Sequence, residues 1–521
     1  MKSWQDSKRQ EIQMAPEKNN GMVYLVGAGP GRADLITVRG ADLLKTADCI
    51  ICDKLANPAL LKFARKDAEV IHVPKRISKG SFTQQEINQL LIEKASSGKT
   101  VVRLKGGDPC IFGRCAEEAA ACAEAGIDFE IVPGVTAAIA GAGYSGIMLT
   151  DREFCSQVVF VTGKEAEGKQ QSNIDWQWLA KFDGNIVFYM GVANLDFIAQ
   201  QLIENGMAKA TPAVVIADAT LPSQRVVKAS LAQLSDKCKQ DYIEPPAIVI
   251  VGAAVDSDTR LNWFMKKPLF GKNIVVTRDA CGNAEFAAKI LERGGNPVEF
   301  TAIKIKPLTH TTRFIRALTK PSQYDWIIFT SSNGVEIAFD FLRSLGKDSR
   351  VFGSAKIAAI GSETAATLAQ FGIKADFVPT IYTSRELGKQ LAAFWNLHGK
   401  KVLLLRSQVA SNELVEWLER AGAEVNNVPA YRIAAAKSKC DWLIKKITDG
   451  IIDWVTFASP SSVGSFFEQI QCDLVKSSSA KVASIGPTTS EELRIFGVRV
   501  DVTAREHTVD GLLAAIEEAC R

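Results

Sequence analysis

The chain has 521 residues, of which 47% are hydrophobic and 23% are charged, and its formal net charge is +4. This length predicts about three domains, and the near balance of 62 basic and 58 acidic residues argues against nucleic acid or a membrane surface as a partner. No apolar run is long enough for a membrane span and no signal-peptide core is present, so we expect a cytoplasmic protein.

Cysteines and histidines give no sign of disulfide or metal chemistry. Eleven cysteines in a chain of this length are far below the density of a disulfide scaffold. Cys49 and Cys52 form a CxxC motif, but they fall in a predicted strand, where residues three apart face opposite sides. We interpret both as core residues. The four histidines share no ligand spacing, so we predict no metal site.

The first predicted strand, Met22–Val26, follows a polar segment, residues 1–20, which we expect to be a flexible tail. The strand leads into the turn GAGPG at residues 27–31. Pro30 removes an N–H where a dinucleotide fingerprint needs a donor for a pyrophosphate. The turn therefore favours a close apolar approach over a phosphate cradle.

Two further strands, Cys49–Cys52 and Glu69–Val73, end beside charged residues. Asp53 follows the first strand and Lys75 follows the second, so both are expected at the ligand-binding edge of a parallel sheet. One interpretation is an acid–base pair, and the other is two solvated charges.

The stretch VVRLKGGDPCIFG, residues 101–113, is the strongest single signal. Its β-branched start suits a buried parallel strand, and the adjacent Gly106 and Gly107 let another surface come close. Asp108 offers a carboxylate on the turn, and a helix is predicted over 114–125. The pattern predicts a strand, a ligand-binding turn and a crossover helix, although an ordinary βα turn has the same pattern.

The rest of the first half contains further strands that end in small residues. The segment PGVTAA, residues 133–138, would let a helix N-terminus contact a ligand. Breaks at 189–191 and 217–220 follow two other strands. The predicted strands are Phe129–Val132, Val158–Thr162, Ile186–Met190, Ala213–Ala217 and Ala247–Val251.

These turns, in this order over residues 21–255, resemble the tetrapyrrole methylases, and the pieces that correspond are GAGPG, GGDP, PGVTAA, YMG and PPAIVIVG. DKLANP, VPKR and RLKGGDPCIFGR resemble the uroporphyrinogen-III C-methyltransferase members. The resemblance implies two α/β lobes that hold S-adenosylmethionine in their cleft, S-adenosylhomocysteine as product, and a homodimer. It makes Asp53 and Lys75 the acid–base positions. It implies cofactor contacts from Pro30, Gly106, Gly107, Asp108, Ile111, Thr136, Ala137, Met190, Ala219 and Ala247.

The residue types suit methyl transfer, in which the protein mainly aligns donor and acceptor. Asp108 would accept a hydrogen bond from a ribose hydroxyl or from the cofactor's amino group. The acceptor that the resemblance implies, uroporphyrinogen III, carries carboxylates, so basic side chains are candidates to pair with them, although each alone is also typical of a solvated surface charge. These are Arg76, Arg103, Lys105 and Arg114. Arg32, Asp151 and Ala219 depart from the family's usual residues.

Residues 256–271 break the periodicity, and we place a linker there. Residues 272–521 then contain an internal duplication. Arg278 and Arg406 end matching strands at an offset of 128 (406 − 278), and Trp326 and Trp454 start matching strands at the same offset. We therefore predict two similar parallel-sheet lobes.

Serine, threonine and glycine recur at the strand ends of this second half. They are typical helix N-caps, and on one edge of two facing lobes they would also form a cleft of donors for carboxylates. No nucleophile or base stands out. The candidate substrate-binding residues are Thr330, Ser331, Asn333, Thr364, Ser459 and Thr488.

The second half resembles uroporphyrinogen-III synthase through TSSNGV, AIGSETA, ASPSSV, ASIGPTT and the Tyr431-Arg432 pair. The resemblance implies a lobe A of about 272–303 plus 434–521, a lobe B of about 307–430, and a two-stranded ladder between them. It implies closure of hydroxymethylbilane with inversion of the last ring and without a cofactor. Tyr431 matches the family's candidate for assisting hydroxyl loss, and a packed interlobe tyrosine is the alternative.

The whole chain is thus expected to be an α/β protein with a two-lobed tetrapyrrole-methylase fold followed by a two-lobed, duplicated parallel-sheet synthase fold. It would make uroporphyrinogen III from hydroxymethylbilane and methylate it twice to precorrin-2. One alternative is that the first half methylates a later corrin intermediate. Another is that the second half is a non-catalytic tetrapyrrole-binding module.

Overall fold

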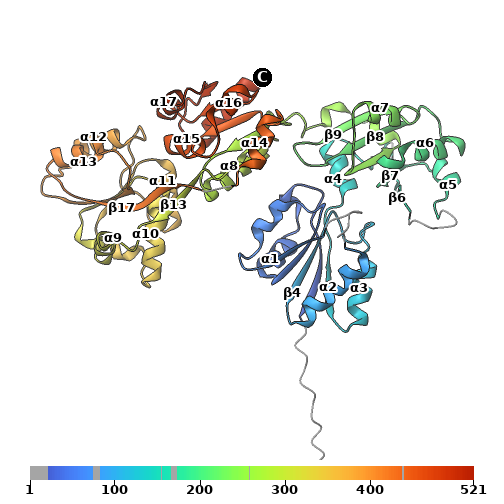
Figure 1. Cartoon of the computed structure of the whole chain (residues 1–521), viewed down its shortest axis with the longest axis horizontal. Coiled ribbons are helices and arrows are strands. Elements are labelled where there is room, and N and C mark those ends of the chain that lie inside the picture. Colours follow the sequence, from blue (N-terminus) through green and yellow to red (C-terminus); the bar gives the residue numbers. More distant parts are fainter. Residues whose placement is uncertain (1–20, 74–81, 154, 166–172, 257, 437–438) are drawn as a thin grey trace, which may run out of the picture. The chain divides into compact units, whose positions relative to one another are not determined.

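The computed structural model describes residues 21–73, 82–153, 155–165, 173–256, 258–436 and 439–521. The chain divides into two compact units, Met1–Gly271 and Lys272–Arg521, each built from two lobes (Figure 1). The predicted tail, residues 1–20, and Lys75 lie outside the described residues. In the described part of the chain, no helix is both long enough and apolar enough to cross a membrane.

The first lobe of the first unit is a five-stranded parallel sheet covered by helices on both faces. Val101 and Val102 are fully buried and point into opposite core layers, which explains the continuous β-branched run. In order across the sheet the strands are β3 (Glu69–Val73), β2 (Cys49–Asp53), β4 (Thr100–Lys105), β1 (Met22–Gly27) and β5 (Asp128–Val132). The main helices are α1 (Val38–Thr46), α2 (Gln84–Ser96) and α3 (Cys115–Glu124).

The second lobe is a mixed sheet, in which only β6 and β7 are parallel neighbours. Strand β9 was not among the strands predicted from the sequence. In order the strands are β6 (Val158–Thr162), β7 (Asn185–Tyr189), β10 (Ala247–Val251), β8 (Pro212–Ala217) and β9 (Arg225–Ser230). The helices α5 (Trp176–Ala180), α6 (Leu195–Glu204) and α7 (Leu234–Gln240) join one core layer, and α4 (Ala137–Tyr144) joins the other.

The segment predicted as a linker packs against the first unit. Phe264 is buried, and its ring centroid lies 4.8 Å from that of Tyr144 at the end of α4. The indole N–H of Trp263 donates a hydrogen bond of 3.1 Å to the carbonyl of Gly143. The aromatic residues of this segment therefore anchor it to α4.

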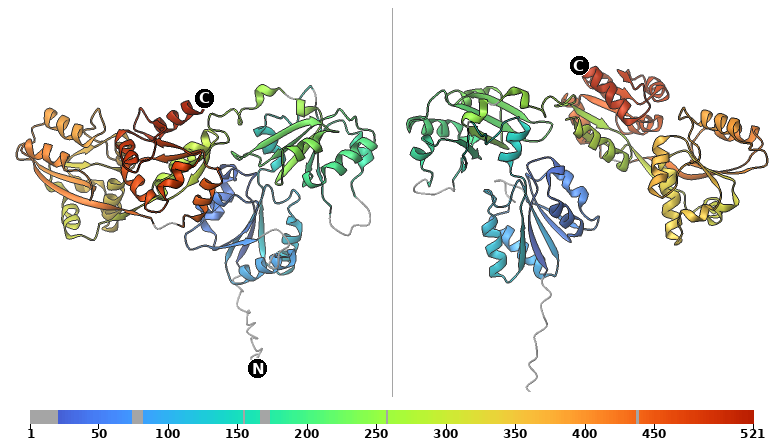
Figure 2. Two further views of the ribbon diagram at one scale, coloured as in Figure 1. Left: turned by 45° about the horizontal axis from the view of Figure 1, so that its top comes forward. Right: turned by 180° about the vertical axis from the view of Figure 1, so that it is seen from behind.

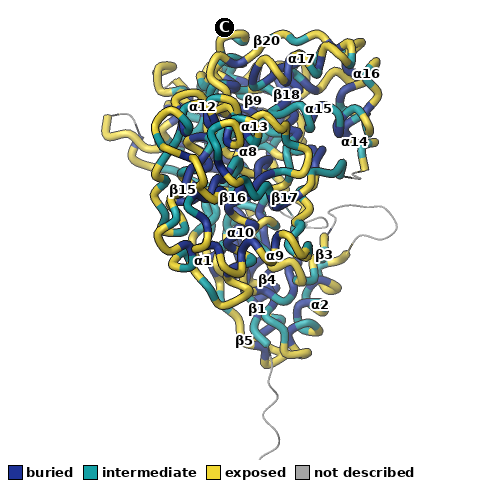
Figure 3. Tube along the Cα trace, turned by 90° about the vertical axis from the view of Figure 1, so that its left-hand side faces the viewer, coloured by how far each residue is buried: buried dark blue, intermediate teal, exposed yellow. Residues whose placement is uncertain are grey.

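In the second unit, lobe A is an all-parallel sheet and lobe B has one antiparallel edge strand. Figure 3 shows the buried residues concentrated along the strands, for example β16 and β18. Lobe A has the order β12 (Asn296–Glu299), β11 (Asn273–Val276), β18 (Trp454–Phe457), β19 (Lys481–Ser484) and β20 (Val502–Thr503). Lobe B has the order β13 (Ile303–Pro307), β17 (Glu424–Ala435), β16 (Lys401–Ser407), β14 (Trp326–Phe329) and β15 (Lys356–Ala359).

The duplication predicted from the sequence is present in the structure. The order β12-β11-β18-β19 in lobe A repeats as β17-β16-β14-β15 in lobe B, which confirms the α/β class and the two similar lobes. Lobe A carries α8 (Ala280–Glu292), α14 (Asp441–Thr448), α15 (Pro460–Phe467), α16 (Cys472–Ser477), α17 (Pro487–Ile495) and α18 (Val509–Cys520). Lobe B carries α9 (Thr312–Thr319), α10 (Ser332–Ser344), α11 (Ser362–Gln370), α12 (Ser384–Phe394) and α13 (Glu413–Arg420).

The two lobes of the second unit are joined by β13 and β17, which run antiparallel side by side (Figure 2). Ile303 pairs with Ala435 at one end of this ladder, and Pro307 pairs with Tyr431 at the other. The chain enters lobe B along β13 and returns to lobe A along β17. The ladder therefore places Tyr431 at its lobe B end, where the side chain joins the buried core of lobe B.

Candidate functional site

Three glycine turns meet at the carboxyl edge of the first sheet. The N–H of Gly107 donates to the carbonyl of Gly29 at 2.8 Å, and the N–H of Gly29 donates back to the carbonyl of Gly107 at 3.2 Å. Both residues have positive φ, 79° for Gly29 and 68° for Gly107, which favours glycine. The turns after β1 and β4 are thus locked together by their own backbones.

The third turn, after β5, has no room for a side chain. A Cβ atom on Gly134 would lie 2.4 Å from the carbonyl oxygen of Gly107 and 2.8 Å from the Cα of Gly27. A Cβ on Gly27 would in turn lie 2.6 Å from the Cα of Gly134. The result is a cradle whose walls are backbone, as the glycine and alanine content of these turns predicts.

Asp108 fixes this cradle through both carboxylate oxygens. Its Oδ1 accepts a hydrogen bond of 2.8 Å from the N–H of Cys110, and its Oδ2 accepts one of 2.9 Å from the N–H of Gly134. The sequence predicted a direct contact from Asp108 to a ligand. The structure shows that the carboxylate also ties the β4 turn to the β5 turn.

The second lobe closes the other side of the cradle. The hydroxyls of Thr136 and Tyr189 lie 2.6 Å apart, and the N–H of Ala138 donates to the Tyr189 oxygen at 3.2 Å. The N–H of Arg32 donates to the Thr220 hydroxyl at 3.0 Å. Burial raises the pKa of Tyr189, so its hydroxyl stays protonated.

Backbone strain collects on turns of both lobes, after β4, β7 and β8. Six described residues other than glycine have positive φ, and five of them lie after β4, β7 and β8. Such conformations cost roughly 1–3 kcal/mol each and persist where the surroundings enforce them, which is typical of ligand sites. The five residues are Phe112, Arg114, Met190, Asp218 and Thr220.

A buried ion network lies beneath the cradle and includes one of the predicted acid–base residues. A guanidinium nitrogen of Arg103 lies 2.5 Å from Asp53 Oδ1, and its Nε lies 3.1 Å from Glu118. The ammonium of Lys105 lies 2.6 Å from the other oxygen of Glu118. Burial opposes the charge of Arg103, but Asp53 and Glu118 together raise its pKa. Burial lowers the pKa of Lys105, against the effect of Glu118.

This network corrects both sequence-based interpretations of Arg103 and Lys105, as partners of substrate carboxylates and as solvated surface charges. Arg103 and Lys105 are each 2% exposed and already pair with a buried carboxylate, so they are neither solvated charges nor free to pair with a substrate. Their partner Glu118 sits on the crossover helix α3 and is fully buried. Arg114 is exposed and pairs with Glu117 at 2.6 Å. Arg76 lies outside the described residues.

The remaining predicted cofactor residues gather around the same edge. Met190 follows β7 and is 45% exposed, whereas Ala219 follows β8 and is buried. Ala247 pairs with Ala217 at the end of β8. Pro30, Gly106, Ile111 and Ala137 are partly exposed on the three turns and at the start of α4. Tyr189 and Phe112, whose ring centroids lie 5.2 Å apart, were not among the predicted site residues. The YMG motif, which contains Tyr189, was the available signal.

The second unit has a corresponding edge of helix N-termini. Ser331 caps α10 by accepting from the N–H of Gly334 at 3.1 Å, and Ser459 caps α15 by accepting from the N–H of Ser462 at 3.2 Å. Gly361 and Gly486 precede α11 and α17 without a side-chain cap, which leaves backbone N–H groups at those helix starts.

Tyr431 lies beside the first of these caps. Its hydroxyl donates a hydrogen bond of 2.9 Å to Ser331 Oγ, and the residue is 5% exposed. Burial raises its pKa above the usual value of 10.0. Thr330 and Asn333 are partly exposed nearby, Thr488 is exposed, and Thr364 is buried at 4% exposure.

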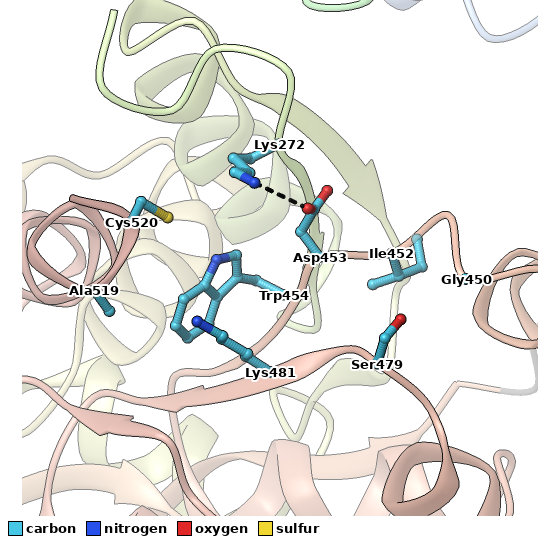
Figure 4. A pocket seen from close by; sticks show the side chains of 9 residues that line it. All are labelled: Lys272, Gly450, Ile452, Asp453, Trp454, Ser479, Lys481, Ala519 and Cys520. Atoms are coloured by element: carbon cyan, nitrogen blue, oxygen red, sulfur yellow. Dashed lines mark hydrogen bonds and ion pairs between the residues drawn. The ribbon is translucent and has the colours of Figure 1, made fainter.

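A cavity of about 260 Å³ in lobe A lies at the opposite, amino edge of its sheet (Figure 4). Asp453 there accepts from the N–H of Asn273 at 2.8 Å and pairs with Lys272 at 3.3 Å. The repeat-equivalent Asp325 accepts from the N–H of Lys401 at 2.9 Å in lobe B. Because both lobes use an aspartate in this way to join neighbouring strands, we assign these cavity residues to the scaffold. Among the described residues, no group of three metal-ligating side chains forms a metal site.

Comparison with known proteins assigns each half to a family. The family described as Tetrapyrrole (Corrin/Porphyrin) Methylases matches residues 22–235, and Uroporphyrinogen-III synthase HemD matches residues 284–514. The Porphyrin biosynthesis protein HemD of Ruminiclostridium josui is 37% identical over 96% of this chain and 98% of its own length. The chain belongs to the tetrapyrrole methylases in its first half and to the uroporphyrinogen-III synthases in its second.

Two further similarities concern the methylase half. The Uroporphyrinogen-III C-methyltransferase of Bacillus subtilis is 39% identical over 68% of this chain and 72% of its own length. A solved Uroporphyrin-III C-methyl transferase from Thermus thermophilus, complexed with S-adenyl homocysteine, is 34% identical over 45% of this chain and 94% of that chain, with a TM-score of 0.39. Three of the motifs that carried the predicted resemblance, GAGPG, GGDP and PGVTAA, form the turns of the backbone cradle.

Proposed function

We propose that this chain is a bifunctional enzyme of tetrapyrrole biosynthesis. Its synthase half cyclises hydroxymethylbilane to uroporphyrinogen III, and its methylase half transfers two methyl groups from S-adenosylmethionine to that product, giving precorrin-2. The observation that carries the proposal is the similarity along 96% of the chain to a porphyrin biosynthesis protein, with one of the two family matches in each unit. The product of the second half is the substrate of the first.

The methylase cradle fits S-adenosylmethionine. The turns pack backbone against backbone, because a Cβ on Gly27 or Gly134 would clash with the neighbouring turn. Without side chains at these glycines, the backbone of the turns is available to contact a flat nucleoside. S-adenosylmethionine supplies an electrophilic methyl group on its sulfonium when bound. The chain's own contribution is alignment: Asp108 holds two turns in register, and Thr136 with Tyr189 joins the lobes on either side.

Asp53 is our candidate for the base that accepts the proton removed from the methylated pyrrole. Arg103 holds its carboxylate from the buried side, and the Asp53 side chain remains 29% exposed toward the cradle edge. Lys75 stays a prediction for the partner position, outside the described residues. Both roles depend on where the pyrrole sits, which a structure with bound product would test.

In the synthase half, we propose that Tyr431 and Ser331 assist loss of the bilane hydroxyl. Ser331 Oγ accepts from both Tyr431 and Gly334, so its own proton is free to donate. The uncapped helix starts at Gly361 and Gly486 offer backbone N–H groups to the substrate's carboxylates. We further propose that the chain acts in the cytoplasm. We also propose that it forms a homodimer through its methylase half, and analytical ultracentrifugation would test this oligomeric state.

Incubation of the full chain with hydroxymethylbilane and S-adenosylmethionine labelled in the methyl group tests the whole proposal. The expected product is precorrin-2 with two labels, and omission of the methyl donor should give uroporphyrinogen III. An unlabelled uroporphyrinogen III in the complete mixture would mean that the methylase acts on a later corrin. Absence of cyclisation would mean that the second half is a binding module.

Replacing Asp108 with alanine should weaken binding of S-adenosylhomocysteine by at least ~10-fold, because two charge-assisted hydrogen bonds that position the turns are lost. Calorimetry on the full chain measures the affinity. Asp42→Ala is the control, since Asp42 is exposed on α1 and pairs only with Lys45 in the described structure. Wild-type affinity in the Asp108 variant would contradict the role of this turn.

Replacing Tyr431 with phenylalanine should lower kcat of cyclisation by ~10²-fold if its hydroxyl takes part in proton transfer. Tyr324→Phe is the control, because that hydroxyl accepts a hydrogen bond from Asn426 elsewhere in lobe B. Because the pKa of Tyr431 is raised, its protonated form persists above pH 10.0, and the wild-type rate should show no loss from this group at neutral pH. Equal cyclisation rates in the Tyr431→Phe and Tyr324→Phe variants would show that the Tyr431 hydroxyl takes no part in catalysis.

A further inference from the structure

Arg406 is a buried cation without a carboxylate partner in the described structure. It is the second-last residue of β16, at the carboxyl edge of lobe B, and is 1% exposed. One guanidinium nitrogen donates to the carbonyl of Ser411, but Nε and Nη1 have no hydrogen-bond partner. A buried charge is unfavourable unless it is paired or fully hydrogen-bonded. The hydrogen bonding of the Arg406 guanidinium is therefore incomplete in the described structure.

Unsatisfied donors and acceptors are concentrated at this position. Five buried side-chain atoms of the described residues lack a partner, and three of them belong to Arg406 and its neighbour Ser407. Native proteins leave few such atoms, and those that remain call for an explanation in function. Ser407 pairs with Tyr431 across the two strands, so the unsatisfied group adjoins the candidate catalytic tyrosine.

The internal repeat provides an independent second observation. Asn283 in lobe A corresponds to Ser411 in lobe B at the offset of 128 (411 − 283). Its buried Nδ2 also lacks a partner, while its Oδ1 accepts from the N–H of Arg278, the repeat equivalent of Arg406. Lobe A thus also keeps an unsatisfied N–H donor near its carboxyl edge, on the residue that corresponds to Ser411 and contacts the equivalent of Arg406.

Charge distribution indicates what these donors would bind. Arg278 in lobe A faces Glu363 of lobe B at 3.8 Å, so it already has an anionic partner. Burial raises the pKa of Glu336 at the start of α10, and Asp340, Asp279 and Glu363 add to this effect. A substrate rich in carboxylates would be repelled by these acidic side chains. Its binding therefore needs a nearby cation to offset the repulsion, and Arg406 supplies one.

We propose that Arg406 forms a binding site for one carboxylate side chain of the tetrapyrrole, with Ser407 as a second donor. This inference rests on the proposed cyclisation in the cleft beside Tyr431. One carboxylate oxygen takes a free N–H group of Arg406, on Nε or Nη1; these two nitrogens do not share an edge of the guanidinium, and Nη2, which shares an edge with each, is held by the Ser411 carbonyl. A guanidinium suits this role because it stays charged and forms charge-assisted hydrogen bonds with a carboxylate.

The test measures cyclisation by the full chain over a range of hydroxymethylbilane concentrations. For Arg406→Met we expect a rise in KM of about 10- to 100-fold, the usual size for loss of a charge-assisted pair, with kcat within about 3-fold of wild type. Arg406→Lys, which keeps the charge, should recover much of the affinity. Arg420→Met is the control, because Arg420 is 68% exposed at the far end of α13.

The midpoint of thermal unfolding of the Arg406 variants distinguishes a role in substrate binding from a role in stabilising the fold. Removal of an unpaired buried charge in favour of an apolar side chain of similar volume should leave the midpoint unchanged or raised. An unchanged KM in Arg406→Met would overturn the inference while leaving cyclisation intact. So would a lowered midpoint together with equal KM values in the methionine and lysine variants. Failure of the wild-type chain to cyclise would instead remove the proposed function.

Discussion

Replacing Glu118 with alanine should lower the free energy of unfolding of the first unit by about 3–5 kcal/mol, because the change leaves two buried cations without their shared anion. Glu118 is fully buried and bonds Arg103 at 3.1 Å and Lys105 at 2.6 Å. Asp53 alone would then face both positive charges. Urea unfolding of the full chain, followed by circular dichroism, measures the loss in the transition of the first unit.

Glu117→Ala is the matched control for this prediction. Glu117 precedes Glu118 on α3, but its side chain is 51% exposed and pairs with the exposed Arg114. Surface pairs of this kind are worth about 0–1 kcal/mol, so the control should unfold close to wild type. Equal, small effects in the two variants would show that the Arg103 and Lys105 charges are solvated after all. That outcome would restore them as candidates for binding the substrate.

Replacing Gly134 with alanine should reduce methyl transfer by ~10²-fold or more, because the new Cβ would lie 2.4 Å from the Gly107 carbonyl oxygen and force the cradle apart. The neighbouring atoms are backbone, so no side chain can rotate away. Cyclisation by the synthase half should keep its wild-type rate. Initial rates with labelled S-adenosylmethionine, together with the affinity for S-adenosylhomocysteine, provide the measurement.

The control for this change is Gly143→Ala, in the helix α4 that follows the same turn. No atom lies within 4 Å of a Cβ at that position, and alanine is the better helix former by roughly 1 kcal/mol. Methyl transfer should therefore be normal in the control. Normal transfer in Gly134→Ala would mean that the turn after β5 relaxes easily and that the backbone cradle is not required for catalysis.

Much of the fold follows from local signals in the sequence. Most strand ends predicted from β-branched runs and glycines agree with the structure within one residue. The repeat offset identified matching strands of lobes A and B because duplicated lobes keep the same spacing between their strands. The strand β9 was missed because its alternating, partly exposed residues carry no turn motif that draws attention to them.

The site was less accessible from the sequence, for a physical reason. Arg103 and Lys105 look like solvent-facing charges, and only the tertiary approach of α3 brings Glu118 to them. The contact between Tyr189 and Thr136 likewise joins residues from two lobes. Sequence motifs identify residues whose role depends on their own backbone, such as Gly107. They do not identify partners that meet only after the lobes pack.

The antiparallel ladder between lobes A and B has a consequence for engineering. Ile305 and Ile433 sit opposite each other on β13 and β17, so the two crossings into lobe B are hydrogen-bonded neighbours. Cutting both strands near this rung leaves two chain ends at one spot, where a short hairpin turn would reseal them. We therefore expect that lobe B can be replaced by the corresponding lobe of a relative without disturbing the sheet of lobe A.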